Sequence, residues 1–329
     1  MRNNDEYNQI DRPAEKPDIH TTLATLVSEQ EGSLNATIFY GLSDLNADEM
    51  QHFIPVWASL PVEHRQRLLQ QLVDMSEVNV ELIYRPIGMH ALNDEHAPVR
   101  EIAIDLLWED KSKLVMNRLI KIAQWDESTD VRTAAVIALG RFILMGELGE
   151  LSPADLTRMQ DVMVYLLNND HEDLHVRRRA LEAIANSSHE IVDEAITSAY
   201  EGHDEHMRAS ALYAMGRTCD DKWRDYVLRE IQSPNPMLRY EAARASGELE
   251  ITESVPQLSR LAQEDEREIQ QVAIWALGEI GGRQAMNVLT ALADQASEQD
   301  DTDLIESIED AIASASFFDE KLMLDFDDD

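Results

Sequence analysis

The residues best suited to catalysis are two histidines and a glutamate in the pattern HExxH, which His171, Glu172 and His175 form. In zinc peptidases this spacing places both imidazoles on one face of a helix, with the glutamate beside the metal-bound water. Glu194 follows at a distance from which it could supply a third ligand. The segment HEDLH nevertheless lies directly before Val176, where a helix is predicted to begin. Because a turn does not hold the required geometry, we expect no peptidase activity.

The same histidines allow a second metal hypothesis. His175 and His206 are 31 residues apart, and His171 and His203 lie near them in the sequence. Helices that pack side by side have axes about 8 to 10 Å apart, which is too far for two imidazoles to share an ion unless the turns tilt together. His171, His175 and His206 are therefore weak candidate ligands, and we expect no bound cofactor.

Six segments share a pattern in which a large apolar residue is followed by an apolar helical run, and in all but the last a basic residue comes second. They begin at Val99, Val131, Val176, Met207, Leu238 and Ile269. The last four starts are separated by 31 residues each time. Within each segment, apolar residues recur at the spacing of a core-facing helix. A fixed period of this size predicts stacked helix, turn, helix units.

Glycine recurs at one register near the end of these predicted second helices, at Gly140, Gly216, Gly247 and Gly278. Glycine at such a position allows neighbouring backbones to approach closely or ends a helix in a left-handed conformation. The recurrence therefore supports a repeated packing arrangement.

These segments resemble HEAT repeats, most of all the short bacterial HEAT-like type found in phycobilisome lyases. The resemblance covers about residues 76 to 313. It implies an all-α fold, an α-solenoid in which about seven helix pairs stack into a right-handed superhelix. Bilin lyase chemistry cannot be assigned to any residue named here, since a fold alone does not transfer function.

Among HEAT-type proteins, deoxyhypusine hydroxylases hold a di-iron centre through His-Glu pairs on their helices. The corresponding place in this sequence reads Arg239, Tyr240 and Glu241, so tyrosine replaces the histidine. The other repeats lack the pair, and the resemblance implies no iron ligand set here.

Composition divides the remainder of the chain. Residues 1–41 are polar, contain two prolines and are expected to be disordered. Residues 42–75 predict a helical cap for the array, and the surplus of sequence near 146–158 predicts a loop insertion with a Ser-Pro helix start at its end. Residues 314–329 form an acidic and hydrophobic tail that either caps the array or serves as a linear motif for a partner.

The chain is strongly acidic, with 28 Lys and Arg against 64 Asp and Glu and a formal net charge of -36. Such a charge disfavours nucleic acid and anionic membranes as partners and attracts basic or mixed-charge proteins. Solubility alone could also explain the acidity. Both interpretations stay open at this point.

The single cysteine, Cys219, cannot form an intramolecular disulfide, which favours a reducing compartment. The first residues lack the apolar region of a signal peptide, and no apolar run reaches the roughly 18 residues of a membrane span. We therefore expect a cytoplasmic protein.

Arginine follows the repeat start in five segments, and the preceding turns are rich in acids and amides. We interpret these arginines as a structural ladder that ties each turn to a helix start, because periodic residues usually serve the period. They are Arg100, Arg132, Arg177, Arg208 and Arg239.

Residues outside the period are better candidates for binding. On the exposed stripe of the second helices, expected to line the concave surface, helical spacing brings together Tyr213, Tyr240, Arg244 and Trp275. Exposed aromatic side chains beside arginine are typical anchors of protein interfaces. In the alternative arrangement, Tyr213 and Trp275 pack between helices. The same side of the helices carries Arg179, Arg217, Glu241 and Glu279.

These observations predict a non-enzymatic interaction scaffold that binds a protein partner of basic or mixed charge on its concave face. The alternative is a metal- or chromophore-dependent enzyme of the HEAT-like lyase or hydroxylase type.

Overall fold

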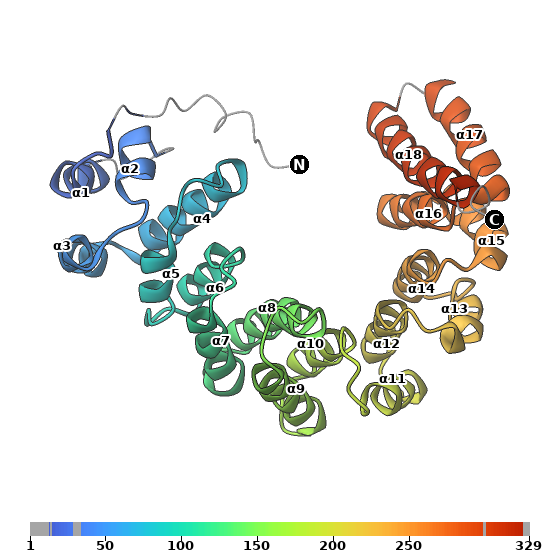
Figure 1. Cartoon of the computed structure of the whole chain (residues 1–329), viewed down its shortest axis with the longest axis horizontal. Coiled ribbons are helices and arrows are strands. Elements are labelled where there is room, and N and C mark those ends of the chain that lie inside the picture. Colours follow the sequence, from blue (N-terminus) through green and yellow to red (C-terminus); the bar gives the residue numbers. More distant parts are fainter. Residues whose placement is uncertain (1–12, 14, 29–33, 299–300, 325–329) are drawn as a thin grey trace. The chain divides into compact units, whose positions relative to one another are not determined.

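The computed structural model describes residues 13, 15–28, 34–298 and 301–324, with side chains up to Ser316. These residues form eighteen α-helices, two short 3-10 helices at Asp221–Trp223 and Thr252–Ser254, and no β-strand (Figure 1). The predicted all-α fold of stacked helix pairs is confirmed. None of the described helices combines the length and the apolar character that a membrane span needs.

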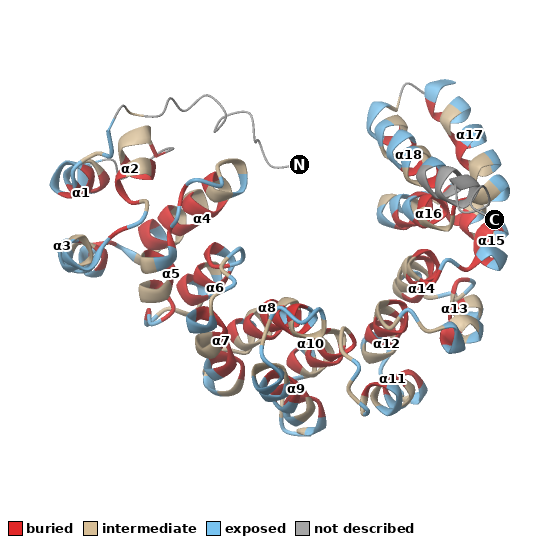
Figure 2. Ribbon diagram, viewed as in Figure 1, coloured by how far each residue is buried: buried red, intermediate tan, exposed pale blue. Residues whose placement is uncertain are grey.

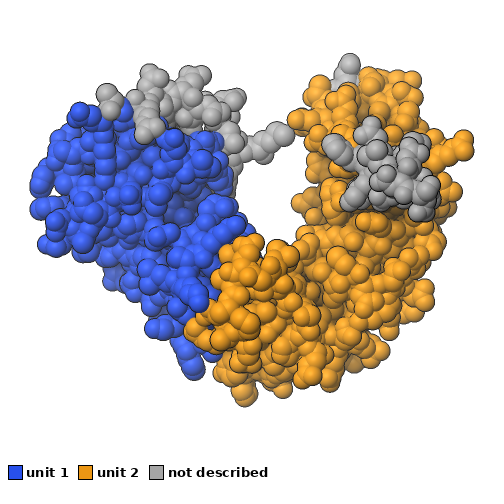
Figure 3. Space-filling model, in the orientation of Figure 1, with its two compact units in different colours: residues 1–142 blue, residues 143–329 orange. Residues whose placement is uncertain are grey.

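The chain divides into two compact units, residues 1–142 and residues 143–329 (Figure 3). The boundary falls inside one helix, α8 (Thr129–Glu147). We call them unit 1 and unit 2 and describe each by itself.

Unit 2 consists of paired helices in two layers. The second helices of the pairs pack against one another in chain order, and each contacts the first helix of its own pair. Buried residues lie on the sides of the helices that face these neighbours (Figure 2). The second helices are α10 (Leu174–Ile184), α12 (Glu205–Arg217), α14 (Pro236–Glu248), α16 (Arg267–Ile280) and α18 (Thr302–Leu324). The first helices are α9 (Pro153–Asn168), α11 (Val192–Glu201), α13 (Arg224–Glu230), α15 (Val255–Leu261) and α17 (Gly282–Glu298).

Three of the second helices, α10, α12 and α14, begin where the repeat pattern predicts and are capped by short polar side chains. Asp204 accepts a hydrogen bond from the backbone N–H of Met207, and Asn235 accepts one from that of Met237. Asp173 caps α10 in the same way. Such caps satisfy backbone donors that the first turn of a helix leaves without a partner.

The arginine ladder is structural, as predicted. Four of its members donate from the guanidinium to the backbone carbonyl six residues earlier, which closes the turn before the helix; these are Arg100, Arg132, Arg208 and Arg239. The Nη2 of Arg239 also lies 2.8 Å from a carboxylate oxygen of Glu264 in the following turn. Arg177 bonds the carbonyl of Leu167 instead. These arginines are therefore committed to contacts within the chain.

The recurring glycines mark the closest approaches between second helices. A Cβ atom on Gly247 would lie 2.9 Å from the Cα of Ala276, and one on Gly278 would lie 2.9 Å from the Cα of Ala311. Gly216 faces Ala245 in the same manner. Any larger residue would push the second helices apart, so the predicted role in close backbone approach is confirmed at these three positions.

Unit 1 contains α1 (Ile19–Ser28), α2 (Ala36–Gly41), α3 (Ala47–Ser59), α4 (Val62–Val78), α5 (Arg85–Ala91), α6 (Ala97–Leu106) and α7 (Lys113–Trp125). Helices α3 and α4 lie where a helical cap was expected. Two interactions organise its core. Asp94 has a side chain only 1% exposed, and it accepts hydrogen bonds from the Trp57 indole at 3.0 Å and from Arg65 Nη1 at 2.7 Å.

The expectation of disorder over residues 1–41 is wrong for α1 and α2. Leu23, Leu26, Ile38 and Phe39 are buried, which supplies the apolar packing that a disordered segment lacks. The apolar pattern of these two helices extends over few residues and is interrupted by polar ones, so it gives only a weak helical signal in the sequence. The rest of this prediction falls on residues 1–12, 14 and 29–33, which lie outside the described residues.

The predicted loop insertion is much shorter than 146–158. Helix α8 continues to Glu147 and α9 begins at Pro153, so five residues, 148–152, connect them. The surplus sequence lengthens helices, because both helices bury apolar residues along their lengths. The Ser152 hydroxyl accepts from the N–H of Asp155, as expected for a Ser-Pro helix start.

The C-terminal segment of the chain is described only in part. Helix α18 packs against α16 and α17 through residues that include Leu304, Ile308 and Ala311. The aromatic and apolar side chains of the predicted tail, from Phe317 onward, lie outside the described side chains.

Candidate functional site

The candidate residues lie on one side of four consecutive second helices of unit 2. We call this the second-helix face. It comprises Arg179 and Glu182 of α10, Tyr213 and Arg217 of α12, Tyr240, Glu241, Arg244 and Glu248 of α14, and Trp275 and Glu279 of α16. Second helices of successive repeats lie next to one another, so residues separated by 31 positions occupy equivalent places on neighbouring helices. Tyr213, Arg244 and Trp275 are related in this way.

Cationic and aromatic side chains join α12 to α14. The guanidinium carbon of Arg244 lies 4.4 Å from the centroid of the Tyr213 ring, a cation–π contact. Glu248 accepts from both Arg217 and Arg244 at 3.4 Å. One carboxylate thus holds two arginines from neighbouring repeats.

A second polar group joins α10 to α12. The Ser210 hydroxyl donates to Glu182 at 2.6 Å and accepts from Arg178 at 2.9 Å. Arg179 forms an ion pair with Glu182 on its own helix. Nearly every charge at this end of the second-helix face therefore has an internal partner.

The two aromatic residues whose exposure was in question differ from each other. Tyr213 is half-buried beneath Arg244, and burial raises the pKa of its hydroxyl. Trp275 is 39% exposed, although its ring also rests beside Gly247. The interface interpretation therefore fits Trp275 better, whereas Tyr213 serves more to support Arg244.

A pocket of about 500 Å³ lies between α14 and α16. Its lining contains two aromatic residues, two acids and one arginine, together with Gln271 and Val272; these five are Tyr240, Trp275, Glu248, Glu268 and Arg244. A neighbouring pocket of about 490 Å³ shares Tyr240 and Glu268 with it. Together they make a groove between two helices, which we call the α14–α16 groove.

Glu241 is the most perturbed acid on the second-helix face. Burial raises the pKa of this carboxyl to about 7, and the nearby Glu182 and Glu248 raise it further while Arg244 and Arg179 lower it. Its Oε2 atom is buried without a hydrogen-bond partner in the described part of the chain. A carboxyl with this surrounding exchanges its proton near neutral pH.

Of the eight predicted binding residues, the structure brings Tyr240, Arg244 and Trp275 to one groove. Tyr213 and Arg217 belong to the contacts around Arg244 and Glu248, Arg179 pairs with Glu182, and Glu241 lies buried near these charges. Burial, together with the charges of Glu250 and Glu248, raises the pKa of Glu279. Glu268 and Gln271 were missed. They precede Trp275 by seven and four residues on α16, and this helical spacing was the signal that could have identified them.

The candidate metal-binding histidines lie at the starts of two helices and in the turn before one of them. His171 lies in the turn after α9, while His175 is the second residue of α10, so the HExxH pattern spans a helix start, as expected. His171, His175 and His206 are exposed. Within the residues that the structure describes, no three or more His, Cys, Asp or Glu side chains come together as metal ligands would.

Comparison with known proteins identifies the repeats. A family model described as HEAT repeats matches residues 225–309, and no curated protein matches the chain. Among solved structures, the Escherichia coli protein YibA is 17% identical over 82% of this chain and 98% of that chain, with a TM-score of 0.43.

Two further structures are similar at the same level. Human deoxyhypusine hydroxylase is 15% identical over 91% of this chain and 96% of its own, with a TM-score of 0.35. The Kap95 structure solved with Nup1 is 13% identical over 90% of this chain and 46% of that one, with a TM-score of 0.47. The paired helices and the glycine contacts of unit 2 agree with this family match, and residues 225–309 consist of HEAT repeats.

Proposed function

We propose that this protein is a non-enzymatic interaction scaffold that binds a basic or mixed-charge segment of a partner protein along the second-helix face of unit 2. The observation that carries the proposal is the α14–α16 groove, in which Trp275 and Tyr240 lie beside Glu248 and Glu268. Tryptophan and tyrosine next to arginine are the residue types that dominate binding energy at protein interfaces.

The groove suits a cationic side chain of the partner. A lysine or arginine that enters it can stack on the Trp275 ring while it pairs with Glu268, since both groups line the same pocket. Arg244 is held over Tyr213 and by Glu248, and it remains available for an acidic group of the partner at the groove edge. This combination favours a mixed-charge segment.

The protein's charge and packing both assist such binding. A formal net charge of -36 steers basic partners toward the molecule before contact. The close contacts at Gly216 and Gly247 hold α12, α14 and α16 together, so the binding side chains are positioned in advance. Less conformational freedom is then lost on binding.

The test is an affinity purification with mass spectrometry at low salt and at about 0.5 M salt, where exposed charges are strongly screened. It compares the wild-type chain with the double variant Arg244→Glu, Trp275→Ala. The control is Trp125→Ala, because Trp125 is 74% exposed on α7 of unit 1 and is not part of the second-helix face. Circular dichroism establishes that all three chains are folded.

We expect a specific partner with a basic segment to bind the wild type and the control, to bind less at high salt, and to be lost from the double variant. Capture of the same amount of partner by the double variant would contradict binding along the second-helix face. Enzymatic turnover that depends on a metal or a chromophore would contradict the non-enzymatic assignment.

A further inference from the structure

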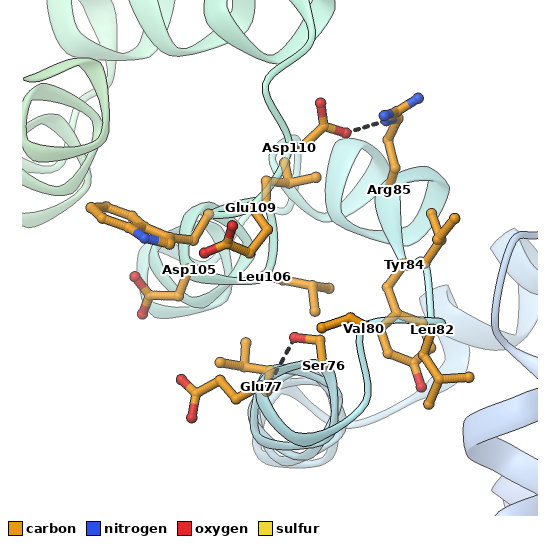
Figure 4. A pocket seen from close by; sticks show the side chains of 14 residues that line it. Ser76, Glu77, Val80, Leu82, Tyr84, Arg85, Asp105, Leu106, Glu109 and Asp110 are labelled. Carbon is orange, nitrogen blue, oxygen red and sulfur yellow. Dashed lines mark hydrogen bonds and ion pairs between the residues drawn. The ribbon is translucent and has the colours of Figure 1, made fainter. Parts of the chain in front are cut away.

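A larger pocket, of about 840 Å³, lies within unit 1 between α4, α6 and the turn that leads into α5 (Figure 4). Its walls include the buried residues Val73, Leu82, Leu106 and Leu107. It shares no residue with the α14–α16 groove. We call it the unit 1 pocket.

Three large apolar side chains of this lining are exposed. Val80 is 90% exposed, Ile83 is 47% exposed and Trp108 is 40% exposed. Isolated exposed apolar residues are common on protein surfaces, but several that line one cavity indicate a binding site.

The turn that presents Val80 and Ile83 is held in place. The backbone of Ile83 accepts from the N–H of Asp44 at 2.6 Å, and its own N–H donates to the Ser43 hydroxyl at 3.0 Å. The buried Tyr84 hydroxyl donates to the carbonyl of Phe39 at 3.1 Å. Exposure of the two side chains is therefore fixed by the fold and does not arise from a loose turn.

Trp108 is also positioned by its neighbours. The guanidinium carbon of Arg141 lies 5.3 Å from the centroid of the indole, and Arg141 Nη2 donates to the carbonyl of Asp110 at 3.4 Å. The ring is thus supported by a cation while part of it remains open to solvent.

Carboxylates surround these apolar residues. The lining contains four acids, Glu77, Asp105, Glu109 and Asp110, and one cation, Arg85, which is paired with Asp110. Figure 4 shows Glu77 of α4 and Asp105 of α6 directed to the same side, with the Arg85–Asp110 ion pair apart from them. Four negative charges against one positive charge leave the lining with a formal charge of three negative units.

We propose that the unit 1 pocket is a second docking site, whose occupant is a short amphipathic basic segment of a partner protein. An apolar side chain of that segment packs against Val80, Ile83 and Trp108. Lysine or arginine residues that flank it pair with Glu77, Asp105 and Glu109. The combination of an apolar surface and a one-sided charge excludes an acidic peptide or a nucleic acid from the pocket.

The test measures binding of a fluorescein-labelled helical peptide of leucine and lysine to the full-length chain by fluorescence anisotropy. A second peptide has serine in place of leucine and keeps the same charge. Three proteins are compared with the wild type: Val80→Asp with Ile83→Asp, the control Leu114→Asp, and Arg244→Glu with Trp275→Ala. Leu114 is a matched control because it is 60% exposed on α7 and does not line the pocket.

We expect the Val80→Asp, Ile83→Asp chain to bind the leucine peptide at least about tenfold more weakly, although it carries more negative charge. The serine peptide should bind the wild type similarly weakly, while Leu114→Asp should leave binding unchanged. Equal binding of the two peptides would show attraction by charge alone and would overturn the proposal. An equal loss in the Leu114→Asp control would show that the loss is not specific to the pocket, which would overturn it as well. Binding that only Arg244→Glu, Trp275→Ala weakens would assign the peptide to the α14–α16 groove instead.

A further double variant, Glu77→Lys with Asp105→Lys, tests the contribution of the carboxylates to peptide binding. It should weaken binding of the leucine peptide at low salt and reduce the dependence of binding on salt. Unchanged salt dependence would contradict the assignment of the lysines to these carboxylates.

Discussion

The second-helix face of unit 2 and the pocket of unit 1 are two different kinds of surface on one chain. In unit 2, second helices follow one another at a constant spacing, glycines bring them close together, and arginines and glutamates fill the exposed side with an internal network. In unit 1, a turn and helices of unequal length leave a larger pocket with exposed apolar side chains. Regular repeats make an extended polar surface with aromatic anchors, while an irregular connection makes a cavity.

The two units also place their charges differently. Unit 1 buries a pair: the side chains of Arg65 and Asp94 are 9% and 1% exposed, whereas those of Arg239 and Glu264 in unit 2 are 16% and 28% exposed. A buried charge that loses its partner costs far more than one that water can reach. Substitutions in the two units should therefore have unequal effects.

The largest expected effect is that of Asp94→Ala. It leaves the buried Arg65 guanidinium and the Trp57 indole without their acceptor, and we expect a loss of about 3 to 5 kcal/mol in the free energy of unfolding. Denaturant titration followed by circular dichroism measures the loss. Glu264→Ala is the matched variant in unit 2 and should cost much less. A comparable loss in both variants would remove the distinction between the two units.

Gly247→Ala should have the next largest effect. Its Cβ would meet the Cα of Ala276 and the ring of Trp275 at 2.9 Å, so α14 and α16 must separate, at a cost of about 1 to 3 kcal/mol. In unit 1, the three atoms nearest to a Cβ on Gly88 all belong to the side chain of Leu107, and none of them is a backbone atom. Thermal unfolding of both variants tests whether close backbone packing is specific to the regular unit. A larger loss of stability in Gly88→Ala than in Gly247→Ala would contradict that specificity.

The smallest effect concerns the pH dependence of Glu241. In the folded chain this carboxyl keeps its proton up to about pH 7, against an ordinary value of 4.5, so the folded state binds more protons between these values. The free energy of unfolding should then fall as the pH rises through this window. Glu241→Gln removes this titration and should stabilise the chain at pH 8 by on the order of 1 kcal/mol, with little change at pH 4.

Denaturant titrations at both pH values measure the Glu241 effect. The matched control is Glu266→Gln, since Glu266 is an exposed acid just before α16. The same gain in the control would show that reduced net charge, and not the burial of Glu241, is responsible.

The sequence by itself determined the repeat architecture. The signals of this architecture are local or periodic, and they recur from one repeat to the next. They are the spacing of 31 residues, the apolar stripes, the capping residues Asp204 and Asn235, and the glycines at 216, 247 and 278. Tyr240, Arg244 and Trp275 could be placed together for the same reason, because one period relates positions in neighbouring repeats. The helices at Ile19–Ser28 and Ala36–Gly41 escaped prediction because they are short and occur once.

Tertiary structure alone decided how far each side chain is buried and which distant residues meet. The exposure of Trp275 and the raised pKa of Glu241 depend on how closely neighbouring helices pack, and the pocket made by Val80, Ile83 and Trp108 depends on segments that no period relates. Hydrogen bonds across some 40 residues, such as that from Ile83 to Ser43, fix the turn beside the unit 1 pocket. A pocket or a shifted pKa is a property of such distances, and sequence patterns record neighbours along the chain but not distances through space.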